Sequence, residues 1–136
     1  MAQNEHPNAA LVRQGFEAIN SGDTQWLADH LVDDVVWHVG GNSKMAGEVR
    51  GKEQVLATLG AGGGGEGSSV ETHDVLANDE HGVVLGTARL QAPDGDRVEY
   101  RFVNVFHFEG DKVKEAWGMS ENDAESDAFF DKLAQG

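Results

Sequence analysis

The stretch "VEYRFVNVFHF", residues 98–108, constrains the fold more than any other part of the chain. Successive side chains of a strand point to opposite faces, so this stretch predicts a long strand with two unlike faces. One face carries Val98, Tyr100, Phe102, Asn104, Phe106 and Phe108. The other face carries Glu99, Arg101, Val103, Val105 and His107. The mostly aromatic set is expected to face the core.

Asn104 is the unusual residue of the aromatic row. A buried amide without a partner costs about 1–3 kcal/mol, so its side chain must bond to protein, water or a ligand. A structural hydrogen bond to a neighbouring strand or helix is one interpretation, because buried polar groups are usually satisfied. Contact with a bound molecule is the other.

The rest of the chain predicts further strands and helices around this strand. Short turn-like connections, "NDE", "APDG" and "EGD", join four strands that we expect to be antiparallel neighbours: 69–77, 81–91, 96–110 and 111–120. A shorter strand is expected at 35–39, with a loop at 41–51. Apolar spacing and capping residues predict helices at 7–20, at about 24–31, at 52–59 and at about 122–134.

Helices on one side of an antiparallel sheet indicate an α+β fold. We expect a single domain over residues 1–136, a cone-shaped barrel in which a curved antiparallel sheet wraps on three to four helices. The stretch "GAGGGGEGSS", residues 60–69, is expected to be a flexible loop at the rim of the cone. A lid over the pocket is one interpretation of this loop, and a plain linker is the other. It lacks the lysine and Ser/Thr of a phosphate-binding loop.

Composition excludes several classes of function. The formal net charge of −14 disfavours nucleic acid as a partner, because such a chain repels phosphate backbones. The absence of cysteine excludes disulfides and thiolate chemistry. The six histidines follow no recognised ligand spacing, so neither a metal nor another cofactor is expected. The polar start, without a signal peptide, and the lack of a long apolar run predict a cytoplasmic protein with no membrane partner.

His38 lies in the apolar stretch "VVWHVGG", residues 35–41. It can be a solvated residue, a satisfied core histidine or a catalytic acid/base. Strict alternation points it away from Trp37 and Val39, although a bulge can exchange the two faces. Asp74 is a second titratable candidate, and its neighbour His73 points to the opposite face.

The order and spacing of several segments resemble the SnoaL-like, ketosteroid isomerase-like branch of the nuclear transport factor 2 fold. The resemblance covers nearly the whole chain and rests on "FEAINSGDTQWLADHLVDDVVWHV", "RGKEQVLATL", "HDVLANDEHGVVL" and "RFVNVFHFEGDKVKEAW". It implies a conical barrel with a deep apolar pocket, and it implies frequent dimerisation. The family includes isomerases, polyketide cyclases, epoxide hydrolases, dehydratases and non-catalytic binders, so the fold alone does not fix a function.

The resemblance also assigns positions to known roles. Ketosteroid isomerases use a carboxylate base near the end of the first strand, and a tyrosine with a protonated aspartic acid as oxyanion hole. The oxyanion aspartic acid corresponds to Asn104, whose amide can still donate a hydrogen bond. The base position corresponds to Val39, or to His38 if the strand shifts by one residue, and the tyrosine position to Gly15. This chain therefore has a different residue at all three positions and keeps a hydrogen-bond donor at one of them, Asn104.

Two hypotheses follow for function: an acid/base enzyme (isomerase, cyclase or hydrolase type) acting on a small apolar carbonyl, epoxide or polyketide-like substrate, or a non-catalytic module that binds such a molecule. The candidate catalytic residues are His38, Asn104 and Asp74, and the candidate binding residues are Trp37, Tyr100, Phe102 and Phe16. A homodimer is expected through the outer sheet face, using Val103, Val105 and Trp117, because apolar side chains there would otherwise be wet.

Overall fold

The computed structural model describes residues 5–44, 46–62, 67–92, 94–121 and 123–135. Within these ranges the helices are α1 (Pro7–Ser21), α2 (Thr24–Asp29), α3 (Lys52–Gly62) and α4 (Asp123–Gln135). The strands are β1 (Leu31–Val39), β2 (Gly47–Arg50), β3 (Ser69–Ala77), β4 (His81–Gln91), β5 (Arg97–Glu109) and β6 (Lys112–Ser120).

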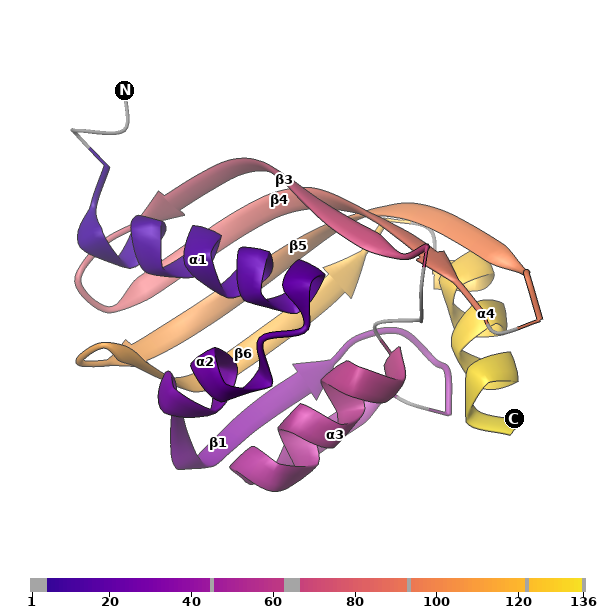
Figure 1. Ribbon diagram of the computed structural model, residues 1–136, viewed down its shortest axis with the longest axis horizontal. Coiled ribbons are helices and arrows are strands. Elements are labelled where there is room, and N and C mark those ends of the chain that lie inside the picture. Colours follow the sequence, from indigo (N-terminus) through magenta and orange to yellow (C-terminus); the bar gives the residue numbers. More distant parts are fainter. Residues whose placement is uncertain (1–4, 45, 63–66, 93, 122, 136) are drawn as a thin grey trace.

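The strands form one curved sheet in the order β2-β1-β6-β5-β4-β3. Figure 1 shows this sheet bending around α1, with α2 and α3 beside β1 and with α4 at the far end of the long strands. Strands β3 to β6 pair in antiparallel fashion with their neighbours, and β1 pairs antiparallel with β2 and parallel with β6. In the following text the inner face is the sheet face toward α1, and the outer face is the opposite one.

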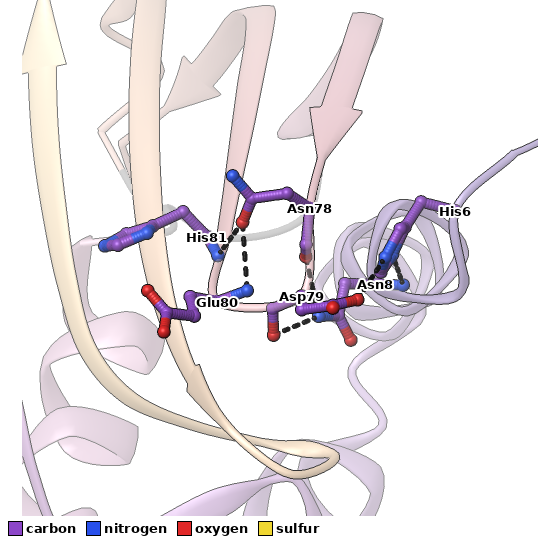
Figure 2. Close-up of polar contacts among 6 residues, drawn as sticks. All are labelled: His6, Asn8, Asn78, Asp79, Glu80 and His81. Atoms are coloured by element: carbon purple, nitrogen blue, oxygen red, sulfur yellow. Dashed lines mark hydrogen bonds and ion pairs between the residues drawn. The ribbon is translucent and has the colours of Figure 1, made fainter.

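The start of α1 is tied to the turn between β3 and β4 (Figure 2). His6 caps the helix, because its Nδ1 accepts the backbone N–H of Asn8 at 3.0 Å, and Pro7 occupies the first helical position. Nε2 of His6 lies 2.9 Å from Oδ1 of Asp79. The Asn8 amide donates to the backbone carbonyls of Asn78 and Asp79 at 3.0 and 3.2 Å. These contacts hold α1 across the inner face.

The core lies between α1 and the aromatic row of β5. Val98, Phe102 and Phe108 are buried, and Tyr100 and Phe106 pack against the same cluster. The ring of Phe16 on α1 stacks on Phe102 at 5.8 Å between centroids and meets Phe106 edge-on at 6.2 Å. The predicted inward face of residues 98–108 is therefore confirmed, because burying these rings is the largest apolar gain that this strand offers.

The predicted α+β fold is confirmed, with three local differences. The loop expected at 41–51 contains β2, a short and largely exposed edge strand with too little apolar character to be recognised. The sheet is mixed rather than wholly antiparallel, because β1 pairs in parallel with β6, far away in the sequence. Helix α3 continues to Gly62, so residues 60–62 of the predicted flexible loop are helical, whereas 63–66 lie outside the described residues.

Candidate functional site

A cavity of about 250 Å³ lies between the inner face of the sheet and the helices. Its wall comes from every helix and from strands β1, β3, β4, β5 and β6. The four expected binding residues, Phe16, Trp37, Tyr100 and Phe102, all line it. None of its lining residues in the described part of the chain is an aspartate, glutamate, lysine or arginine. The cavity is thus suited to an uncharged and largely apolar molecule.

Asn104 brings an amide into this apolar wall. Alternation along β5 places it between Phe102 and Phe106 on the inner face, opposite Gly118 of β6. Its side chain makes no hydrogen bond to another described residue. The structural partner that sequence reasoning left open is therefore not found among the described residues, and the amide is available to a bound molecule.

Gly118 makes room for this amide. A Cβ atom at Gly118 would lie 3.2 Å from Oδ1 of Asn104 and 3.4 Å from Nε1 of Trp37. The first distance is tighter than most contacts of a Cβ atom, so a side chain at this position would press on the Asn104 amide and would touch the Trp37 indole. The glycine therefore keeps an amide and an indole N–H together in the middle of the cavity wall.

Tyr100 adds a phenol on the same face of β5, four residues from Asn104. Burial raises the pKa of Tyr100 to about 12, so the phenol keeps its proton at neutral pH. Its ring meets Phe130 of α4 edge-on at 6.1 Å between centroids. Tyr100 and Asn104 lie about 13 Å apart along the strand. They therefore offer two separate hydrogen-bonding groups on one wall of the cavity.

His30 also lines the cavity, and sequence reasoning did not single it out. It is the C-terminal cap of α2, and its ring stacks on Trp26 at 3.8 Å between centroids and 15° between planes. Its Nδ1 lies 2.7 Å from the backbone carbonyl oxygen of Trp26. The spacing of four residues between an aromatic ring and a histidine at a helix end is the sequence signal that could have identified it.

His38 lies on the outer face, outside the cavity lining. Its Nε2 is 2.6 Å from Oε2 of Glu115, its Nδ1 is 3.8 Å from Oε2 of Glu48, and its ring stacks on Trp117 at 5.3 Å. Strict alternation therefore holds along this part of β1, and Trp37 faces inward instead. This position does not support the role of proton shuttle inside the cone that the sequence suggested for His38.

Asp74 is likewise placed away from the cavity. It is exposed and pairs in register with Leu85 of β4, which faces outward. A register shift in β3 between Thr72 and Asp74 puts Asp74 on the outer face, so its suggested catalytic role has no support from its position. Its neighbour His73 lies 3.1 Å from Oγ1 of Thr87 through Nε2.

The described residues lack two further kinds of feature. None of their helices is long and apolar enough to cross a membrane. No group of three or more histidine, aspartate or glutamate side chains among them is arranged to hold a metal ion.

Comparison with known proteins agrees with this geometry. The SnoaL-like domain matches residues 12–116. The uncharacterized protein Rv0034 of Mycobacterium tuberculosis is 36% identical over 90 residues, which cover 65% of this chain and 68% of that protein.

Two solved structures share the fold over almost their whole length. Bal32a, from a soil-derived mobile gene cassette, superimposes with a TM-score of 0.83 at 27% identity, covering 90% of this chain and 95% of Bal32a. IdmH, a putative polyketide cyclase from Streptomyces antibioticus, gives a TM-score of 0.72 at 17% identity, covering 92% of this chain and 98% of IdmH.

Proposed function

Because the chain belongs to the SnoaL-like domain family, we propose that its cavity binds a small, uncharged and largely apolar molecule and that acid/base chemistry takes place on that molecule. The substrate class is a carbonyl, epoxide or polyketide-like compound, and the reaction is an isomerisation, cyclisation or hydrolysis. The likeness to IdmH, named a putative polyketide cyclase, supports this class.

One observation carries the proposal: the amide of Asn104 lies on an apolar cavity wall without a hydrogen-bond partner among the described residues. A polar group that faces an apolar cavity is costly unless something there pairs with it. An amide N–H can donate to a carbonyl or epoxide oxygen of a ligand. It can also stabilise negative charge that develops on that oxygen, and loss of such a donor costs about 2.7–4 kcal/mol of barrier in enzymes that depend on it.

A second candidate function is binding without turnover. The absence of carboxylates from the described cavity lining favours it, because the related isomerases rely on such groups. Both functions require the same cavity and the same amide. They differ only in whether a group in the cavity moves a proton.

Binding is tested with a pair of ligands that differ by one oxygen. We expect 2-tetralone, an apolar bicyclic ketone, to bind in the cavity and quench the fluorescence of the cavity tryptophans. Tetralin is the hydrocarbon of the same ring system and lacks the oxygen that Asn104 would bind. Asn104→Leu should weaken 2-tetralone binding about tenfold, the effect of about 1.4 kcal/mol for one hydrogen bond, and should leave tetralin binding nearly unchanged.

Glu99→Gln on the exposed face of β5 is the matched control and should bind both ligands like the wild type. Equal weakening of ketone and hydrocarbon in Asn104→Leu would mean that the amide supports the cavity shape only. Failure of both ligands to bind the wild type would contradict the proposed function.

A further inference from the structure

We propose that His30 is the proton-accepting group of the cavity, with Nε2 as the basic atom. The proposal rests on the proposed function, because it requires that the cavity hold a ligand. It adds the residue that would turn a binding cavity into a site for proton transfer, a role that neither His38 nor Asp74 can fill from the outer face.

The hydrogen bond of His30 fixes which ring nitrogen is basic. Nδ1 lies 2.7 Å from the carbonyl oxygen of Trp26, and a carbonyl oxygen only accepts, so Nδ1 carries the hydrogen. In the neutral imidazole Nε2 then holds a free lone pair. Nε2 makes no hydrogen bond to another described residue, so this lone pair is available to a ligand.

The surroundings of His30 hold the ring in place. Stacking on Trp26 and the bond at Nδ1 restrict its two side-chain torsions, and its backbone carbonyl accepts the N–H of Val113 at 2.8 Å. A base fixed in this way requires little reorganisation when a proton moves. The hydrogen bond from Nδ1 to a backbone carbonyl thus fixes the tautomer of the His30 ring.

Elimination among the lining residues supports the same assignment. His30 and Tyr100 are the titratable side chains in the described lining of the cavity. Tyr100 keeps its proton at neutral pH, so it can donate but cannot accept a proton. His30 is therefore the group of this lining that can take a proton from carbon or oxygen.

The position of His30 also limits the substrate. It lies beside Val113, which pairs with Phe108, four residues along β5 from Asn104. Four residues of strand span about 13 Å, so His30 and Asn104 act on different parts of one molecule. The side chains of both residues line the same cavity, so the substrate class is an apolar ketone whose oxygen faces Asn104 and whose neighbouring C–H faces His30.

The elementary step is proton transfer without net oxidation. For a ketone, Nε2 takes a proton from the carbon next to the carbonyl, the C–H electron pair forms the carbon–carbon double bond of an enolate, and the negative charge moves to the oxygen. His30 becomes an imidazolium and then returns a proton to carbon. In heavy water the returned particle is a deuteron, so the step is visible as exchange.

The test follows loss of the C1 proton signal of 2-tetralone in heavy water by NMR, over a series of pH values. The wild type should accelerate exchange over buffer, with a rate that rises as one group loses its proton. His30→Gln should lose about 10²-fold, the scale of general base catalysis, and should still bind 2-tetralone. His107→Gln, a histidine on the outer face, should exchange like the wild type.

A second readout needs no ligand. Nitrogen-15 shifts of the His30 ring should show a protonated Nδ1 and a bare Nε2 in the neutral form, and the opposite tautomer would overturn the proposal. Binding of 2-tetralone with equal exchange in wild type and His30→Gln would overturn it as well, while leaving the proposed binding function intact. A wild type that neither binds nor accelerates exchange would contradict both.

Discussion

At the scale of single residues, the polar groups of the cavity differ in what they can do. In the proposed site, Asn104 would donate a hydrogen bond, Tyr100 would donate one while keeping its proton, and His30 would accept a proton through Nε2. Gly118 contributes by lacking a side chain, because a Cβ there would press on Asn104. The chemistry of the cavity thus depends on a few positions in an otherwise apolar wall.

Tyr100 gives a direct measurement of burial at this wall, because it is the only tyrosine of the chain. Burial raises the pKa of its phenol to about 12, so phenolate absorbance near 295 nm should appear about two pH units later in the native protein than in the denatured chain. The stability contributed by the neutral phenol is complete below pH 10 and is lost as the pH rises toward 12.

The wild type should lose at most about 2–3 kcal/mol of its free energy of unfolding between pH 10 and pH 12 because of this phenol, and Tyr100→Phe should not show this loss. Urea titrations at several pH values measure the difference. A native phenol that titrates near pH 10 would show that Tyr100 is open to water.

At the scale of elements, α4 closes one end of the cavity and is held there by apolar packing together with polar contacts. Phe130 lines the cavity and packs on Tyr100, and Phe129 is buried. Both carboxylate oxygens of Asp127 accept the backbone N–H of Asn42 at 3.0 Å, and Lys132 pairs with Asp94 and Asp96. These contacts join the helix to two separate loops.

Removing one of these contacts should loosen the helix. Asp127→Ala should lower the free energy of unfolding by about 1–2 kcal/mol, because it leaves the Asn42 N–H without its charged acceptor. Hydrogen exchange at the Asn42 amide should quicken, and the exposed Glu125→Ala on the same helix serves as control. Unchanged exchange at Asn42 in Asp127→Ala would show that this contact does not hold α4 in place.

Local patterns predicted much of the fold and part of the site. Alternation along 98–108 identified the inner face, the aromatic wall and Asn104, because a strand's faces are set by its own residues. The parallel pairing of β1 with β6 and the edge strand β2 depend on contacts across the chain, which no local pattern encodes. His30 was missed for the same reason: its place in the cavity arises only when α2 meets the start of β1 and β6.

At the scale of the whole molecule, the outer face of the sheet carries a partly exposed apolar centre. Register places Leu85, Val103 and Met119 side by side across β4, β5 and β6, and Leu85 and Met119 are 39% and 51% exposed. Val105 pairs with Trp117 in the next row. We propose that the homodimer expected from the sequence forms through this exposed apolar patch.

Val103→Glu should weaken this dimer at least about tenfold in sedimentation experiments, because it buries a charge at the centre of the interface. Gln14→Glu adds the same charge at an exposed position of α1 and should leave association unchanged. Each chain carries a formal charge of −14, so added salt should strengthen the wild-type dimer by screening. A wild type that sediments as a monomer at high micromolar concentration would refute the dimer.

We propose that the inner cavity, rather than the histidine and carboxylates of the outer face, is the functional site. The most direct test is a map of NMR shift changes on adding 2-tetralone to labelled protein. We expect changes at the side-chain NH₂ of Asn104, the indole N–H of Trp37 and the backbone of Gly118. Changes confined to His38, Glu48 and Glu115 would show that the ligand binds at the outer face instead.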